Sequence, residues 1–435
     1  MASFARGSTI EKIIVRNPDD TKDQDLTLQV GPMSFYEDII DASFHIEIMI
    51  ADVFGWLESF PIRSGSKVYL RIKTATGVID FSKEEEPLYI SNIKAAGSSN
   101  KREVFVMQLE SKAAFTNHLK RLTKKYKSST NEVIKEILTK VLEVPETRVK
   151  DDNIEKPTNK IEFLGVYKRP LQTCVGLAVK SVPNNHSSKI PTKGGSGMFF
   201  WECLDGFRFQ SPDQIFDNAK KNKDDIFTYV KVGAFDALDP ANNFHITNEP
   251  VWNNNHNLFE KLSMGQYNSQ LGLFDTSERS HVVIDRDSLA KHDYNADKDG
   301  DELSNSEYFQ PKEFSTDSSR YMLLVKDDRL FDNSDEQDEN SKTSMEHVEY
   351  EARRLSRYSA LFSQTLEITV PLNVQLHAGS VVNLKFPRIN IDKPSGGENN
   401  PASGLYMIKT LSHKFSSEGD FTGMQLVRDA YTKLS

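Results

Sequence analysis

The chain has 435 residues, more than a single hydrophobic core can organise, which predicts about two to four domains. Hydrophobic residues make up 37% of it and charged residues 27%, and its two cysteines exclude a disulfide framework. The net charge is −9, but residues 293–340 alone hold five basic and fifteen acidic residues, a balance of 5 − 15 = −10. The rest of the chain is therefore near neutral, which excludes the basic surface that a duplex-binding protein needs.

Residues 1–115 are predicted to form a first β-barrel. Short runs rich in β-branched and aromatic residues alternate in places between apolar and polar, and glycine, proline and asparagine clusters separate them. This spacing is typical of a small antiparallel barrel or sandwich. The predicted strands are Ile10–Val15, Leu26–Val30, Ser43–Ile50, Lys67–Ile72, Leu88–Ile93 and Val104–Leu109.

Residues 116–240 change to a helical period and are predicted to form the first part of an α+β insert domain. Ser129-Thr130-Asn131-Glu132 has the pattern of a capping box before an apolar helix that continues to Leu142. A second helix is predicted over Leu171–Val182. Asp205-Gly206 is a tight-turn signal that joins two aromatic strands into a hairpin.

The second half of the chain is predicted to complete a second, related barrel. Residues 241–284 supply its first strands, and residues 285–350 hold an acidic insertion and the rest of the insert domain. A helix is predicted from about Met345 to Phe362, so residues 351–435 form a helix and the barrel. Its predicted strands lie near Gln364–Val370, Val381–Phe386, Gly404–Ser412 and Gly423–Arg428.

An internal repeat supports the two-barrel prediction. Three segments recur in the same order, at offsets of 379 − 65 = 314, 405 − 88 = 317 and 424 − 107 = 317. Three matches in register favour one β module used twice, with a long insertion between the copies. The matched segments are Gly65–Ile72 with Gly379–Phe386, Leu88–Ile90 with Leu405–Met407, and Met107–Leu109 with Met424–Leu426.

The acidic insertion contains a pattern similar to a calcium loop. Oxygen-bearing side chains alternate, Gly300 stands at the sixth position, and a distal carboxylate follows one place later than an EF-hand requires. We prefer the interpretation of a solvated acidic loop and keep weak calcium binding as a hypothesis. The candidate ligands are Asn295, Asp297, Asp299, Asp301 and Glu307.

The order of these modules resembles the central baseplate hub protein of contractile-tailed phages, a family that includes late-control-protein-like hubs. The resemblance is best over Arg353-Arg354-Leu355, Leu366–Pro371, Leu376–Ser380, Gly404–Ile408 and Leu426–Asp429. It implies an α+β, β-dominated fold with two barrels related to the tail-tube subunit. It also implies a homotrimer whose six barrels form a pseudo-sixfold ring.

The resemblance further implies a structural protein of the virion's tail baseplate, assembled in the host cytoplasm, and not an enzyme. Its expected partners are a central spike protein that is often lytic, tube-initiator or tail-tube proteins, the tape-measure protein, and DNA only in passage. No cofactor is expected beyond the hypothetical calcium. The first residues lack the apolar core of a signal peptide, and no apolar run is long enough to span a membrane.

Ring-forming strands, rather than catalytic residues, are therefore the predicted site. Two alternatives stay open: a secreted calcium-dependent β-rich binding module or cell-wall hydrolase, and a hub from a non-phage contractile injection system. The strand residues predicted to matter for ring formation are Gly65, Val68, Leu70, Tyr89, Met107, Leu109, Gly379, Val382, Leu384, Tyr406, Met424 and Leu426.

Overall fold

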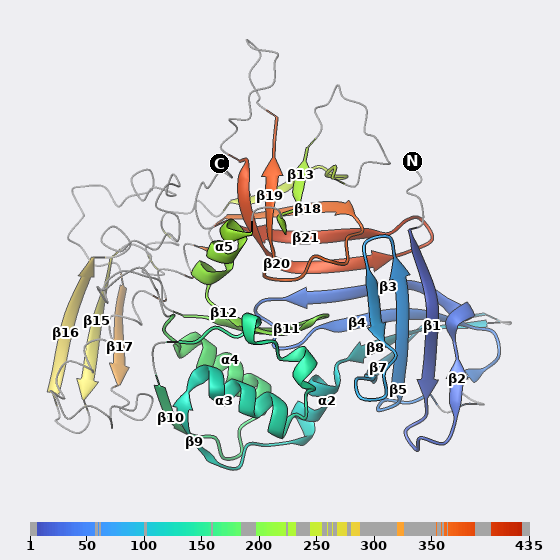
Figure 1. The fold of residues 1–435 in the computed structure, drawn as a ribbon, viewed down its shortest axis with the longest axis horizontal. Helices are drawn as coiled ribbons and strands as arrows, with labels where there is room; N and C mark the ends of the chain where they lie inside the picture. The colour runs from blue at the N-terminus through green and yellow to red at the C-terminus, as the bar shows by residue number, and fades with distance from the viewer. Residues whose placement is uncertain are drawn as a thin grey trace, which may run out of the picture.

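Two β-rich modules, an α+β insert and a separate three-stranded sheet make up the described part of the protein (Figure 1). The computed structural model describes residues 7–56, 60, 62–99, 102–157, 160–183, 197–222, 225–231, 244–254, 259, 263, 268–275, 280–287, 320–325, 354, 358, 361–362, 364–387 and 402–428.

Fourteen described strands form one sheet, in which every pair is antiparallel except β13 with β19. β6 (Val78–Phe81) lies beside β5, β19 (Val381–Lys385) beside β20, and β13 (Thr228–Val230) beside β19. The main path through the sheet is β14 (Val251–Asn254), β18 (Gln364–Pro371), β21 (Phe421–Val427), β20 (Gly404–Phe415), β3 (Val30–Asp38), β4 (His45–Asp52), β8 (Arg102–Glu110), β7 (Leu88–Ser99), β5 (Lys67–Thr74), β1 (Ser8–Arg16) and β2 (Asp23–Asp25).

The two modules are continuous with each other in one sheet, and the two predicted barrels are not confirmed. β3 pairs with β20 from Thr410↔Asp38 to Phe415↔Met33. The second edge of β3 is therefore taken by the other module, and no closed barrel is observed among the described strands. The fold is a β-rich α+β fold built around one large, mostly antiparallel sheet.

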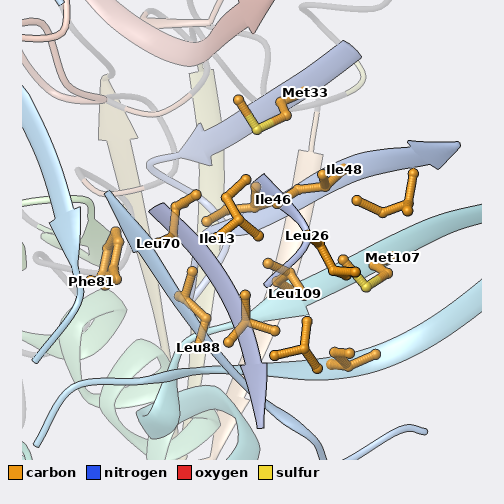
Figure 2. Packing of buried hydrophobic residues seen from close by; sticks show 14 of the residues in the cluster. Ile13, Leu26, Met33, Ile46, Ile48, Leu70, Phe81, Leu88, Met107 and Leu109 are labelled. Atoms are coloured by element: carbon orange, nitrogen blue, oxygen red, sulfur yellow. The ribbon is translucent and has the colours of Figure 1, made fainter. Parts of the chain in front are cut away.

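The first module has a core of its own, drawn in Figure 2. Alternate side chains of each strand point inward, as a half-buried strand requires, and each contributes about 1.5–3 kcal/mol through burial. The labelled members come from β1, β3, β4, β5, β6, β7, β8 and the chain before the 3₁₀ turn η1 (Thr27–Gln29). They are Ile13, Leu26, Met33, Ile46, Ile48, Leu70, Phe81, Leu88, Met107 and Leu109.

The insert begins after β8 and packs its helices against two short two-stranded sheets. Its elements are α2 (Lys112–Leu119), β9 (Lys125–Ser129), α3 (Thr130–Glu136), the π turn η2 (Ile137–Val141), the 3₁₀ turns η3 (Glu146–Arg148) and η4 (Asp151–Asn153), β10 (Lys160–Leu164), α4 (Pro170–Lys180), β11 (Phe199–Cys203), β12 (Gly206–Gln210) and α5 (Pro212–Lys221). The two predicted helices and the predicted hairpin are present. β9 pairs with β10, and β11 pairs with β12.

The predicted capping box forms only in part. Ser129 is the N-cap of α3, but its side chain makes no capping bond and its hydroxyl instead donates to Asn131 Oδ1 at 2.6 Å. The carboxylate of Glu132 accepts from Ser128. The helix start was therefore predicted correctly and its hydrogen bonds were not.

The second module repeats the strand order of the first around a second core. β18, β21, β20 and β19 follow one another as β4, β8, β7 and β5 do. β14 pairs with β18 as β3 pairs with β4, whereas β13 runs parallel to β19 where β1 is antiparallel to β5. Of the predicted helix at 345–362, the described positions Arg354, Tyr358 and Leu361 are helical.

Two predictions about loops and strands were wrong. The acidic stretch 293–340 is not a loop throughout, because β17 (Arg320–Val325) pairs in parallel with β15 (Asn268–Asp275), which also pairs with β16 (Ser280–Asp287). The apolar residues Met322–Val325 explain this strand between two acidic stretches. Leu26–Val30 is mostly the turn η1, and the neighbouring strand β3 was missed. Among the described helices, none has the length and apolar character needed to cross a membrane.

Candidate functional site at the joint between the modules

The repeated Gly-Ser pair forms a tight turn that starts β5 in the first module. Gly65 has a φ of +91°, a conformation that favours glycine. Its N–H donates to Ile90 O at 2.7 Å, and Ile90 N donates back to Ser66 O at 3.0 Å. The Ser66 hydroxyl accepts from Arg63 N at 3.3 Å. The glycine permits the turn and the serine closes it, which explains why this pair recurs.

The second module contains the same turn with the same hydrogen bonds. Gly379 has a φ of +83°, and its N–H donates to Ile408 O at 2.8 Å. Ile408 N donates to Ser380 O at 2.8 Å, and the Ser380 hydroxyl accepts from His377 N at 3.2 Å. The module is thus repeated in its backbone bonding as well as in its sequence.

The hydrogen-bond register corrects the middle segment of the sequence repeat by one residue. Val68 pairs with Leu88, and its counterpart Val382 pairs with Tyr406, so the offset in β7 and β20 is 406 − 88 = 318 and not 317. Both strands also bulge at equivalent places, between Ile90 and Asn92 in β7 and between Ile408 and Thr410 in β20. A shared bulge is strong evidence for a common module, since bulges are specific features of a fold.

Glu37 joins the second module's turn to the first module. It lies on β3, is buried, and its Oε2 accepts from Ala378 N at 2.8 Å. Its Oε1 accepts from Leu204 N at 2.7 Å and lies 3.2 Å from His377 Nδ1. Burial alone would raise the pKa of Glu37, but His377 and these donors outweigh it and hold the pKa below its usual value. One ionised carboxylate therefore connects β3, the β11–β12 turn and the turn before β19.

The insert hairpin closes over the same turn. Trp201 on β11 is fully buried, and its Nε1 donates to Ala378 O at 3.0 Å. Its ring covers Gly379 so closely that a Cβ on that glycine would lie 2.4 Å from Trp201 Cζ2. Together with Glu37, this contact fixes the insert and both modules to one another at a single point.

His413 on β20 lies behind this joint and is uncharged. Its Nδ1 is 3.0 Å from Thr422 Oγ1 and its Nε2 is 3.3 Å from Leu376 O. Burial lowers the pKa of His413 to about 4. At neutral pH the Nε2–H can donate to the carbonyl while Nδ1 accepts from the hydroxyl, so the ring satisfies both neighbours without a charge.

A second buried carboxyl, Glu155 in the insert, makes stability depend on pH. Its oxygens accept from Ser211 N at 2.6 Å and from the Ser211 hydroxyl at 3.2 Å, at the start of α5. Burial, with Asp213 and Asp217 nearby, raises the pKa of Glu155 to about 7. The folded state therefore binds the carboxyl proton of Glu155 more tightly than the unfolded state does. The stability that protonated Glu155 contributes is complete below the unfolded pKa and is lost as pH rises through 7.

Glu155→Gln should therefore remove part of the protein's loss of stability between about pH 4.5 and 7. At pH 8 the free energy of unfolding of the variant should exceed that of the native chain by roughly 3 kcal/mol, because the amide carries no charge and its oxygen still accepts from Ser211. Urea unfolding at pH 5 and pH 8 measures it. Glu146→Gln, at an exposed position, is the matched control and should leave the profile unchanged. An identical pH profile for Glu155→Gln and the native chain would show that Glu155 is ionised in the fold.

The strand residues predicted from the sequence are mostly core residues. The side chains of Val68, Leu70, Met107 and Leu109 belong to the first core, whereas Val382, Leu384, Tyr406, Met424 and Leu426 belong to the second. Tyr89 is half-buried and stacks on Phe115, and Gly65 and Gly379 form the turns. A role in ring formation stays a prediction, and it would act through the strands' backbone edges because these side chains point inward.

The candidate calcium ligands Asn295, Asp297, Asp299, Asp301 and Glu307 lie outside the described residues, so calcium binding also stays a prediction. Within the described part of the chain, no group of three histidine, cysteine, aspartate or glutamate side chains is placed to hold a metal. Burial raises the pKa of the Cys174 and Cys203 thiols, so neither is a thiolate at neutral pH.

A small pocket lies where the insert meets the first module. Glu202, Arg148 and Ser111 line it, and its volume of about 20 Å³ is room for roughly one water molecule. Glu202 Oε1 accepts from Arg148 Nη2 at 3.1 Å and Oε2 accepts from the Ser111 hydroxyl at 2.6 Å. The pocket is therefore part of the packing between insert and module and is too small for an organic substrate.

The residues that make the joint were missed from the sequence. Glu37 interrupts the apolar alternation of β3, and Trp201 follows two other aromatic residues, so neither stands out in the sequence. A usable signal existed at one position: Glu37 falls in phase with buried Met33 and Phe35, where a charged residue needs a buried partner.

The fold of this chain is similar to that of a solved phage tail protein. It is similar to the 43 kDa tail protein of prophage MuSo2 from Shewanella oneidensis, with a TM-score of 0.53, 10% identity, and coverage of 98% of this chain and 100% of that one. It is also similar to a tail protein from Neisseria meningitidis MC58, with a TM-score of 0.49, 10% identity and 97% coverage of both chains.

A component of the type VI secretion system of E. coli also matches, with a TM-score of 0.45 and 10% identity over 98% of this chain and 78% of that one. No family model matches the chain, and no curated protein does. At such low identity the likeness to the Shewanella protein establishes a shared fold and leaves the function to other arguments.

Proposed function

We propose that this chain is a structural component of a contractile tail's baseplate hub. Three copies would form a ring of pseudo-sixfold symmetry that joins the tail tube to the central spike and lets the tape-measure protein and DNA pass. The observation that carries the proposal is the repeated module, with the same strand order, turn and bulge in both copies. Three chains with two such modules each present six similar units, which can match a sixfold tube above and a threefold spike below.

The buried joint supports a mechanical role. A ring that seats a tube needs its units held at a fixed angle, and here Glu37, Trp201 and the β3–β20 pairing fix the two modules to each other. The fold shared with a prophage tail protein supports the same placement in the virion. A chain whose charge outside residues 293–340 is near neutral would also not retain DNA phosphates during passage.

The mass of the purified protein in solution, measured by light scattering, tests this proposal. We expect three times the mass of one chain at micromolar concentration and above. A monomer that persists at high concentration, and also when a trimeric spike protein is added, would contradict the ring. That result would direct attention to a monomeric binding module instead.

A further inference from the structure

The pairing of β20 shows how one module receives a strand from another. On one side β20 pairs with β21 from Met407 to Lys414. On its other side its first part, Gly404 to Met407, pairs with β19, and its later part, Thr410 to Phe415, pairs with β3 of the other module. The bulge at Lys409 separates the two parts. The later half of β20 is thus the acceptor edge of the intrachain joint.

β7 is the counterpart of β20, but no described strand lies at the position that corresponds to β3. β8 pairs with one side of it, and β5 pairs with its first residues, Leu88 and Tyr89, on the other side. Beyond the bulge, no strand in the described part of the chain pairs with that side of residues 92–97. Asn92, Lys94 and Gly97 are exposed. The first module therefore carries the same acceptor edge as the second, and no described strand of the chain occupies it.

β14 is the counterpart of β3, the strand that fills such an edge. Trp252 pairs with Leu366 of β18 as Phe35 pairs with Ile46 of β4. β14 ends the path of described strands, so its other edge carries no described strand. The side chain of Val251 is 55% exposed and that of Trp252 is 37% exposed, which is unusual for residues of a strand next to a core.

We propose that β14 of one copy of this chain adds, antiparallel, to residues 93–96 of β7 in the next copy. Equivalence with the β3–β20 pairs sets the register: Asn254 opposite Ile93, Asn253 opposite Lys94 and Trp252 opposite Ala95. The proposal rests on the ring described above and assigns its contact between chains. Each copy offers one donor strand and one acceptor edge, so the contact is head-to-tail and repeats around a closed ring.

The two kinds of joint differ in one respect. Asn254 of the second module occupies the position that Glu37 has in the first. Arg63 of the first module occupies the position that His377 has in the second. The joint between chains therefore lacks the ionised carboxylate that anchors the joint within a chain. On dilution the contacts between copies should open while each chain keeps its two modules joined.

Paired cysteines test the register. In the double variant Lys94→Cys with Asn253→Cys, mild oxidation should link different chains into covalent dimers and trimers on a non-reducing gel, because directly opposite residues are close enough for a disulfide. Tyr36→Cys with Ser412→Cys is the matched control: those residues pair within one chain, so it should form a disulfide without a gain in mass. Lys94→Cys with Val251→Cys is out of register and should cross-link at least ten-fold less. The native thiols, Cys174 and Cys203, are buried.

Hydrogen exchange of the unmodified protein gives a second test that needs no variant. Amides of residues 93–96 and 251–254 should exchange at least ten-fold more slowly in the oligomer than after dilution to monomer, whereas amides of β3 should not change. A trimer in which neither the cysteine pair links nor these amides are protected would overturn the β14–β7 contact and leave the ring intact. A monomer under all conditions would overturn both.

Discussion

Replacing Gly379 by alanine is expected to lower the free energy of unfolding by roughly 3 kcal/mol. Two costs add at this position. The φ of +83° is unfavourable for any residue with a Cβ, and the new methyl carbon would lie 2.4 Å from Trp201 Cζ2. Trp201 cannot easily move, since it is fully buried and its Nε1 donates to Ala378 O. Urea unfolding at neutral pH measures the loss.

The repeat provides a matched control for this substitution. Gly65 occupies the same place in the first module, with a φ of +91° and the same backbone hydrogen bond, but a Cβ there would meet no described atom within 4 Å. Gly65→Ala should therefore cost only the backbone strain, roughly 1–2 kcal/mol. The difference between the two variants isolates the contact between the insert and the second module.

A double-mutant cycle separates that contact further. Trp201→Phe removes the part of the ring that faces Gly379, so the alanine should cost at least about 1 kcal/mol less in that background. Equal losses for Gly379→Ala and Gly65→Ala would mean that the hairpin does not press on the turn, and the assigned joint would then be wrong.

Repetition was predictable from the sequence because its two key residues have local requirements. A turn with positive φ favours glycine, and the hydroxyl that closes it comes from serine, so the same residue pair occurs in both modules, as Gly65-Ser66 and Gly379-Ser380. The strands β4 and β8 were also predictable, since buried residues alternate with less buried ones along each of them. Such features depend on neighbours in the chain and leave a readable pattern.

The one-residue slip in the middle segment has a physical cause. The alignment matched Leu88-Tyr89 with Leu405-Tyr406, whereas the hydrogen bonds match Leu88 with Tyr406. The first residues of β20, Gly404 to Ile408, are buried on both faces. Without an alternation between buried and exposed positions, the sequence contains no signal that fixes the register of this strand.

The joint was not predictable because it depends on contacts between distant residues. A charged residue such as Glu37 argues against a buried strand, so β3 was not predicted. The residues that bind Glu37, Leu204 and Ala378, are 167 and 341 residues away in the sequence. The single sheet that joins the modules has the same origin, since β3 pairs with a strand more than 370 residues later. Such pairings follow from the assembled fold and not from any local pattern.

Glu37→Gln is expected to destabilise the protein by roughly 3 kcal/mol at pH 7. The carboxylate accepts one N–H at each oxygen, from Leu204 at 2.7 Å and from Ala378 at 2.8 Å. An amide has only one acceptor oxygen, so one of these N–H groups would face an NH₂ group and stay unpaired in a buried place. Urea unfolding measures the loss, and hydrogen exchange at Leu204 and Ala378 should locate it at the joint.

The dependence of this loss on pH distinguishes an ionic joint from simple packing. The pKa of Glu37 is lowered in the fold, so its contribution is complete above the unfolded pKa and disappears as pH falls through the folded value. The gap between Glu37→Gln and the native chain should therefore shrink at low pH. Glu47→Gln, on the adjacent strand β4 with its carboxylate partly exposed, should change stability by less than about 0.5 kcal/mol throughout. A Glu37→Gln loss that stays constant with pH would place the effect in side-chain packing, and the carboxylate would then not be what holds the two modules at a fixed angle.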